Sequence, residues 1–316
     1  MRLVYMMMFL LFAFIACEEN VNQYAEIETE YNLFMIINTG NPYQAGIITK
    51  SYFGNGTDPN FNYVDPFVED LQVRMWYEDT VKIFEPGLLT INQNTASESN
   101  IKVYEHNDCI IETNVAVELE VVLNEERRFR SYLLTPDTLQ FIADLTDQIL
   151  PPPEETHIIA NWEGVSRQII FLPRLKIWYR KTDFIDRYYY VPIAFTDYEG
   201  ERIPVFSRGS AVTNISIPLT IVQQAMEDIS AGDFRKSDYK IMKAFWEIAV
   251  FDENLSTYYA INVDAAEDFN VNLNSFRFSN VSGANGLFGA YHITTLPVRI
   301  DPDYIYSFGY VAGFPY

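Results

Sequence analysis

The sequence contains little of what metal or thiol catalysis needs, with only two cysteines and three histidines in 316 residues. His106, His157 and His292 are far apart, and none belongs to a spacing that could bind zinc. A Gly-x-Ser-x-Gly elbow, a phosphate-binding glycine loop and a dinucleotide-binding motif are also missing from the sequence. We therefore predict that the protein is not an enzyme and uses no cofactor.

Positive charge is also scarce. Lys and Arg number 22 against 43 Asp and Glu, which gives a formal net charge of −21 at pH 7. A surface this negative repels the phosphate backbone of nucleic acids. The composition therefore argues against nucleic acid as a partner.

The apolar run Leu3–Ile15 follows Arg2 and ends at Ala16-Cys17. A membrane-spanning helix needs about 20 apolar residues, whereas the apolar part of a secretory signal has roughly 7–15. We therefore predict a lipoprotein signal peptide at residues 1–16, with Cys17 carrying the lipid that holds the protein at a membrane. The polar, Glu-rich segment 17–28 is then a tether.

Acylation of Cys17 would leave Cys109 as the second cysteine of the chain, without a disulfide partner. Cys109 follows Asp108, and a neighbouring carboxylate raises the pKa of a thiol. We expect Cys109 to be buried and unreactive.

Aromatic residues make up 16% of the chain, and together with β-branched residues in short alternating runs they favour strands. The predicted strands are 32–38, 45–52, 71–77, 115–123, 167–172, 187–195, 212–217 and 240–251. Glu85-Pro86-Gly87 is expected to be a turn between strands. A helix is predicted near 218–230, because Leu219, Val222 and Met226 share one face and Pro218 suits a first-turn position. Residues 252–263 are a weaker helix candidate.

Pro151-Pro152-Pro153 divides the chain, because three prolines fit poorly in a helix or strand and well in a stiff connector. Residues 29–150 are predicted to form a β-sandwich of immunoglobulin-like or transthyretin-like type. Residues 154–316 are predicted to form a second β-rich domain with one or two helices. The fold class is therefore mainly β.

One segment has the spacing of a calcium-binding loop. Asp58, Asn60 and Asn62 place oxygens at alternate positions, and Glu69 stands at position twelve. Tyr63 occupies the position where the sharp turn needs glycine, so a plain polar hairpin loop is the favoured interpretation. We predict no metal site, and keep these residues as a weak calcium candidate.

The tryptophans are candidates for stacking against a ligand. Trp76-Tyr77 and Trp178-Tyr179 lie in strand-like runs, where one aromatic of each pair must face inward. Core packing is the favoured role for the tryptophans, but the outward member of each pair could serve a ligand.

Loops at one end of a sandwich are the usual place for a binding site. The glycine-containing segments 54–62 and 279–286 are the candidate loops, and they are flanked by aromatic residues. Phe53, Phe61 and Phe288 are accordingly the candidate ligand-binding residues.

Three sequence features together resemble an uncharacterised family of Bacteroidota surface lipoproteins, known only as a domain of unknown function. They are the segment around Cys17, the early pattern Asn38-x-Gly40…Gln44…Ser51-Tyr52, and the tail Asn280–Tyr291. The resemblance implies a β-rich fold, an outer-membrane location and frequent association with TonB-dependent transporters. Glu18-Glu19, directly after Cys17, resembles the acidic signal that sends such lipoproteins to the outer face, so we expect the protein to face the exterior. The resemblance supplies no catalytic residues.

Three classes of function remain open. The first is a non-catalytic binding or accessory module at the cell surface, for which an outer-membrane transporter is the candidate partner. The second is a pilin-like structural subunit, although residues 18–31 contain no Arg or Lys for a trypsin-like processing protease. The third is a glycan-directed hydrolase, for which the carboxylates Asp264, Glu267 and Asp268 are close in sequence. The binding module is the favoured hypothesis.

Overall fold

The computed structural model describes residues 29–51, 65–92, 98–124, 127–153, 155–164, 169–198, 200–261 and 278–313. Residues 31–316 form one compact unit. The predicted signal peptide, Cys17 and the tether lie outside the described residues. Within the described ranges, no helix has the length and apolar character required to cross a bilayer.

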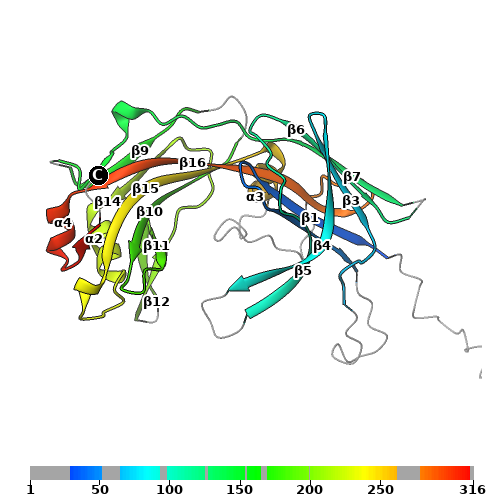
Figure 1. Ribbon diagram of the computed structural model, residues 1–316. Helices are drawn as coiled ribbons and strands as arrows, with labels where there is room; N and C mark the ends of the chain where they lie inside the picture. Colours follow the sequence, from blue (N-terminus) through cyan, green and yellow to red (C-terminus); the bar gives the residue numbers. More distant parts are fainter. Residues whose placement is uncertain are drawn as a thin grey trace, which may run out of the picture. The chain divides into compact units, whose positions relative to one another are not determined.

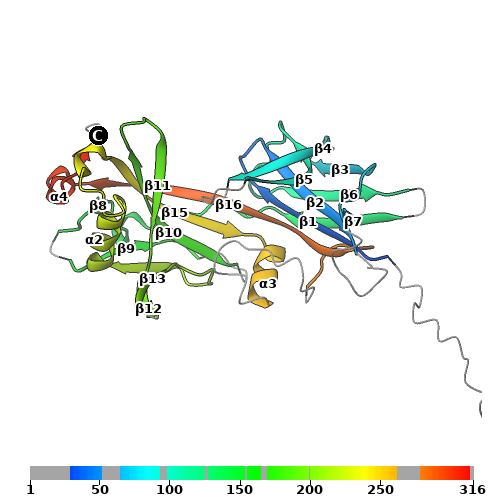
Figure 2. The same ribbon diagram turned by 90° about the horizontal axis from the view of Figure 1, so that it is seen from below.

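The fold is mainly β, as predicted, with a few helices (Figures 1 and 2). A 13-stranded sheet has the main order β11-β10-β15-β16-β1-β2-β5-β4-β3-β6-β7. The first-half strands are β1 (Tyr31–Asn38), β2 (Gln44–Lys50), β3 (Gln72–Tyr77), β4 (Thr80–Asn92), β5 (Glu98–His106), β6 (Ala116–Val122) and β7 (Arg128–Leu134).

The second half contains the remaining strands and the helices. They are β8 (Ile149–Leu150), β9 (His157–Asn161), β10 (Phe171–Arg180), β11 (Asp186–Val191), β12 (Ala194–Tyr198), β13 (Glu201–Val205), β14 (Asn214–Pro218), α2 (Leu219–Asp228), β15 (Lys240–Phe251), α3 (Glu253–Ile261), β16 (Asn285–Ile300), α4 (Pro302–Ser307) and β17 (Val311–Ala312). Short 3₁₀ turns lie at Ala143–Leu145 and Lys236–Asp238. β12 pairs with β13 and β9 pairs with β14, each as a separate two-stranded sheet.

Strand β4 connects two layers of the first half. Its beginning pairs with β3, where Phe84 lies opposite Val73, and its remainder pairs with β5, where Glu85 lies opposite Glu105. The expected turn at Glu85-Pro86-Gly87 is therefore wrong. This proline and glycine stand where one strand changes partners, a place where a missing donor and a missing side chain are tolerated.

The core of the first half lies between these two layers. Alternate residues of the strands point into it, as in Val117, Leu119 and Val121 of β6, which are at most 1% exposed. Phe129 of β7 and Phe288 of β16 fill the same core. This two-layered arrangement gives the first half its sandwich character.

Strand β16 belongs to both halves. Its residues 285–291 run parallel to β1, and its residues 291–298 run antiparallel to β15. The sheet is thus continuous across the predicted division at Pro151–Pro153. Leu139 and Leu150 pack in the core of the second half, and Pro152 is itself buried.

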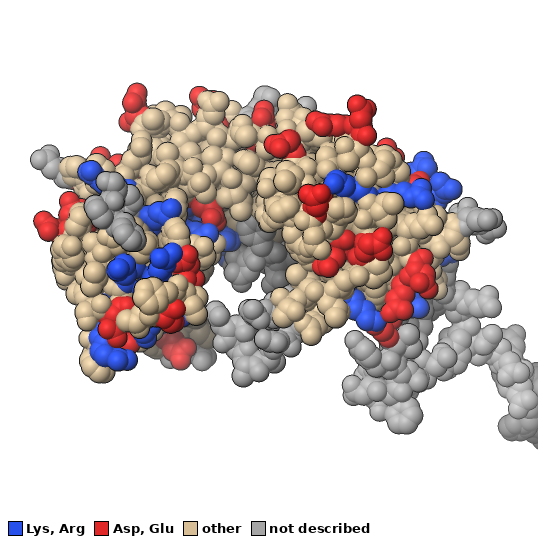
Figure 3. Space-filling model, in the orientation of Figure 1, with Lys and Arg blue, Asp and Glu red and all other residues tan. Residues whose placement is uncertain are grey.

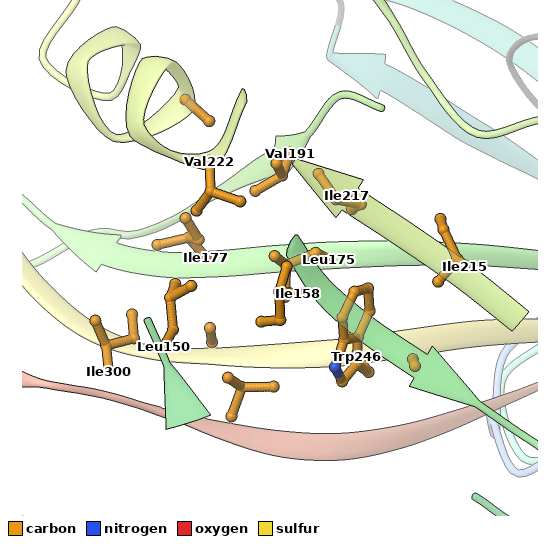
Figure 4. Packing of buried hydrophobic residues seen from close by; sticks show 14 of the residues in the cluster. Leu150, Ile158, Leu175, Ile177, Val191, Ile215, Ile217, Val222, Trp246 and Ile300 are labelled. Carbon is orange, nitrogen blue, oxygen red and sulfur yellow. The ribbon is translucent and has the colours of Figure 1, made fainter. Parts of the chain in front are cut away.

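The core of the second half lies between the large sheet on one side and, on the other, helix α2 with the two-stranded sheet of β9 and β14. Val222 of α2 points toward Ile177 of β10 and Val191 of β11, while Trp246 of β15 fills the space below Ile158 (Figure 4). Both predicted helices are confirmed, since α2 spans Leu219–Asp228 and α3 spans Glu253–Ile261. Their apolar residues supply the stability, because isolated helices of this length are marginal in water.

Candidate functional site on the outward face of three strands

The outward face of β10, β11 and β15 is the candidate site, and strand alternation produces it. In β10, Leu175 and Ile177 are fully buried in the core, so Lys176 and Trp178 lie on the opposite face. Tyr179 packs against the core. The expectation that one aromatic of this pair faces inward is confirmed.

In the other aromatic pair, Trp76-Tyr77, one side chain also faces inward. Tyr77 packs against the core of the first half, and Trp76 lies on the opposite face of β3. Trp162 and Trp246 are buried, at 1% and 0% exposure. Packing in the core is thus their role, as expected.

Strand register brings the outward side chains together. Lys176 lies opposite Tyr190 of β11 and Phe245 of β15. Trp178 lies opposite Tyr188 of β11 and Lys243 of β15. Side chains directly opposite on one face are close enough to interact, so these positions form one surface, which we call the cation–aromatic face.

Two lysines on this face are each flanked by two aromatic rings. The ammonium of Lys176 lies 4.2 Å from the ring centroid of Tyr188 and 5.4 Å from that of Tyr190. The ammonium of Lys243 lies 4.5 Å from the ring of Trp178 and 4.8 Å from that of Phe245. Attraction between each cation and the electron-rich ring faces holds the flexible lysines in place.

Arginines extend the face in both directions along β10. Arg174 lies with its guanidinium carbon 4.9 Å from the ring centroid of Tyr190, and Arg180 lies 5.8 Å from that of Trp178. At about 3.3 Å per residue, the distance from Arg174 to Arg180 is roughly 20 Å. The cation–aromatic face is therefore long and narrow, following the strand.

Two carboxylates balance part of the charge. Lys176 donates a hydrogen bond to Glu247 at 3.0 Å, and Arg180 forms an ion pair with Asp186. Burial by itself would lower the pKa of Lys176, but the nearby Glu247 carboxylate raises it by more. The net shift of the pKa is therefore upward, and the ammonium keeps its charge. Arg180 lowers the pKa of Asp186, which stays ionised.

Among the side chains named for this face, the cations Arg174, Lys176, Arg180 and Lys243 outnumber the carboxylates Glu247 and Asp186. In Figure 3, basic and acidic side chains are interspersed over the part of the molecule that contains β10, β11 and β15. For Lys243, the described residues show contacts with aromatic rings and no ion pair. This local charge is opposite in sign to the net charge of the chain, −21.

Helix α3 closes one end of the face and a hairpin turn marks the other. Leu172 and Phe251, which follow the same face of β10 and β15, are covered by Leu255 and Tyr259 of α3. At the opposite end, the turn between β10 and β11 exposes Phe184 to 82%. Between these limits Tyr188, at 53% exposure, offers the most accessible ring.

The predicted ligand-binding phenylalanines are placed elsewhere. Phe288 is 0% exposed in the core of the first half, which corrects the expectation that it flanks an open loop. It lies in β16 opposite Met35 of β1, and its amide donates to Asn280 at 2.9 Å. Phe53 and Phe61 lie outside the described residues, as does the loop 54–62.

The second candidate loop, 279–286, is held in place by hydrogen bonds to the sheet and within the loop. Ser282 forms a two-way backbone bridge with Arg130 of β7, and Gly286 donates to Ser279. Gly283 has a φ of +88°, and a side chain there would meet the carbonyl of Arg128. This loop is therefore built into the edge of the sandwich.

The weak calcium candidate is only partly described. Glu69 forms an ion pair with Lys102 at 2.9 Å, and Asp65 forms another with the same lysine at 2.7 Å. Asp58, Asn60 and Asn62 lie outside the described residues. Across the described ranges, no group of three or more His, Cys, Asp or Glu side chains is placed to hold a metal ion.

Cys109, His106 and His292 have structural contacts in the described part of the chain. Cys109 is buried, as predicted, and burial raises the pKa of its thiol to about 11. His292 contacts the hydroxyl of Thr39 at 2.8 Å, and burial lowers its pKa. His106 accepts a hydrogen bond from the amide of Asp108. The carboxylates Asp264, Glu267 and Asp268 lie outside the described residues.

A cavity of about 510 Å³ lies between the end of β7 and the start of α3. Its lining includes Tyr132, Thr135, Asp252 and Asn254. Asp252 is 2% exposed and accepts a hydrogen bond from the amide of Leu255, so it caps α3. Burial raises the pKa of Asp252 to about 7.

No protein-family model matches this sequence, and no curated protein is similar to it. The resemblance to Bacteroidota surface lipoproteins therefore stays a prediction that rests on its motifs. Arguments about function come from the geometry of the chain itself.

Sequence reasoning singled out Trp178 but missed its cationic neighbours. Lys176 and Trp178 are two residues apart in β10, so their shared face could have been read from alternation. Lys243 and Tyr188 come from other strands, and only the register of β11, β10 and β15 brings them to the same surface.

Proposed function

We propose that this protein is a non-catalytic binding module at the bacterial cell surface, held there by a lipid on Cys17. The observation that carries the proposal is the cation–aromatic face, in which Lys176 and Lys243 each lie between two rings. Tyr, Trp and Arg side chains are enriched at binding surfaces, and Tyr188, Trp178 and Arg174 stand beside the two lysines on this face. A role as accessory subunit of an outer-membrane transporter is one form of this function.

The position of the face supports binding by contact with an extended partner. Its residues lie on the regular strands β10, β11 and β15, which hold side chains more precisely than loops do. Cation–ring contacts fix the lysines before any ligand arrives, which lowers the entropy lost on binding.

The test compares the detergent-extracted, full-length lipoprotein with a variant of the face. Tyr188→Ala removes an exposed ring, and Trp76→Ala, on the outward face of β3, is the matched control. Molecules co-purifying with the wild type are identified by mass spectrometry. We expect at least one component to be lost with Tyr188→Ala and kept with Trp76→Ala. If the wild type, Tyr188→Ala and Trp76→Ala co-purify with the same molecules, the proposal is overturned. If a transporter co-purifies with the wild type and is lost with Tyr188→Ala, the accessory role is identified.

A further inference from the structure

We infer that the cation–aromatic face binds an acidic saccharide chain, lying along β10 with its acid groups on the lysines. The inference rests on the proposed function and names the class of ligand. It follows from the spacing of the charges, the rings between them and the charge of the whole protein.

The lysines are placed to meet acid groups that repeat along a chain. Lys176 lies opposite Phe245, and Lys243 lies opposite Trp178, so the two lysines are diagonal neighbours across β10 and β15. The backbone positions of diagonal neighbours on one face are about 7–8 Å apart. Two lysines that start from adjacent strands in this way suit acid groups on nearby units of one chain and not a single small anion.

The aromatic rings beside the lysines provide a surface on which sugar rings can pack. Tyr188 is half exposed, and Trp178 and Tyr190 are partly exposed beside the lysines. A sugar ring presents an apolar C–H face, which packs against an aromatic ring, and hydroxyls, which bond to polar neighbours. An acidic saccharide therefore uses both kinds of side chain on this face.

Charge density favours a saccharide over a nucleic acid. Glu247 and Asp186 already neutralise Lys176 and Arg180 in part, which leaves a modest local excess of positive charge. The protein as a whole carries −21 and repels densely charged polymers at long range. A chain with an acid group on only some units, and apolar faces between them, meets less repulsion.

The test measures binding of two saccharide pairs to the full-length protein by calorimetry at low and moderate salt. One pair is a hyaluronate oligosaccharide, with a carboxylate on every second unit, and its fully methyl-esterified form, and the other is a κ-carrageenan oligosaccharide, with a sulfate on every second unit, and a neutral agarose oligosaccharide. We expect the acidic member of at least one pair to bind and its neutral counterpart not to bind. Which acidic member binds decides between carboxylate and sulfate as the acid group. Binding should weaken as salt increases, because the lysines are partly solvent-exposed.

Variants locate the ligand on the face. Lys243→Gln keeps a polar side chain but loses the charge, and we expect binding about tenfold weaker. Trp178→Ala should weaken binding by about five- to tenfold through lost ring contact. Lys50→Gln and Trp76→Ala, on strands of the first half, are the matched controls and should bind as the wild type does. Unfolding midpoints of all four variants separate lost contacts from lost structure.

Other outcomes are equally decisive. Equal binding of acidic and neutral saccharides, or no binding of any of the four, would overturn the acidic-saccharide assignment. Tighter binding of a single-stranded oligothymidylate would replace it with a nucleic acid. In either case the co-purification test still stands, because a component lost with Tyr188→Ala supports a binding module whatever its chemical class.

Discussion

Lys176 of β10 and Glu247 of β15 form an ion pair at 3.0 Å whose side chains are only 18% and 14% exposed. This pair joins adjacent strands beneath the rings of Tyr188 and Tyr190, which lie within 5.4 Å of the ammonium. It thus links the stability of the sheet to the geometry of the candidate binding face.

Removing one partner of this pair should be costly. Glu247→Gln leaves the ammonium of Lys176 partly buried without a counter-charge, so we expect a loss of about 1–3 kcal/mol in the free energy of unfolding. Lys176→Met together with Glu247→Gln should recover part of that loss. Denaturant unfolding of the single and double variants measures both effects. Additive losses would show that the two side chains do not interact.

Asp252 should make stability depend on pH. Its pKa is raised by burial from 3.8 to about 7, so the folded state favours the protonated form. The stabilisation from this group is complete below about pH 4 and is lost as pH rises through about 7. The total change is on the order of 4 kcal/mol. Asp252→Asn should remove this dependence and make the protein more stable at pH 8.

The control for this prediction is another helix cap. Asp301 caps α4 by accepting a hydrogen bond from the amide of Asp303 at 2.8 Å, in an exposed position. Asp301→Asn should leave the dependence between pH 4 and pH 7 as in the wild type. Thermal unfolding across this range is the measurement, and an Asp252→Asn profile parallel to that of the wild type would contradict the prediction.

Local patterns were sufficient for parts of the fold. The predicted strand 240–251 coincides with β15, and the periodicity around Val222 and Met226 located α2. In both segments the residue spacing itself shows which face is buried. The turn predicted at Glu85-Pro86-Gly87 was wrong because proline and glycine are common in turns but are also tolerated where a strand changes partners. Strand β4 changes from β3 to β5 at this point.

Long-range pairing was the part that the sequence could not supply. The sequence pattern predicts a loop at residues 279–286 and no strand after residue 251, yet residues 285–291 pair with β1, about 250 positions earlier in the chain, and bury Phe288 between the layers. The candidate site had the same difficulty, because Lys243 and Trp178 are neighbours only through the register of β10 and β15.

Lipidation of Cys17 is tested by its removal. Each buried CH₂ of an acyl chain contributes about 0.8 kcal/mol to membrane binding, so losing the acylated thiol should release the protein. We expect Cys17→Ala to appear as soluble or unprocessed protein in fractionated cells, whereas Cys109→Ala should stay with the membrane. Mature Cys17→Ala protein in the outer-membrane fraction would contradict the lipoprotein hypothesis.

The C-terminal segment should be needed for stability. Ile305 and Tyr310 are 3% and 2% exposed in the core of the second half, and Tyr310 donates to the carbonyl of Met226. Deleting residues 301–316 should cost about 5 kcal/mol or more, and Tyr310→Phe about 1 kcal/mol. Unfolding curves measure both.

Deleting residues 301–316 also tests the alternative that the protein is a pilin-like structural subunit. A binding module should run as one species in size-exclusion chromatography, with the truncated chain less stable. Stable multimers of the full-length protein that disappear in the truncated chain, without loss of stability, would favour the structural subunit.

Cleavage near the prolines should leave the two halves together. Glu155 is exposed and lies two residues after Pro153, so a glutamate-specific protease is expected to cut there. The resulting fragments still share the pairing of β1 with β16, and Leu139 and Leu150 of the first fragment pack in the core of the second. The cut protein should therefore elute as one species under native conditions and separate only in denaturant. Two folded fragments that elute apart without denaturant would show that the halves are independent domains, as the prolines alone had suggested.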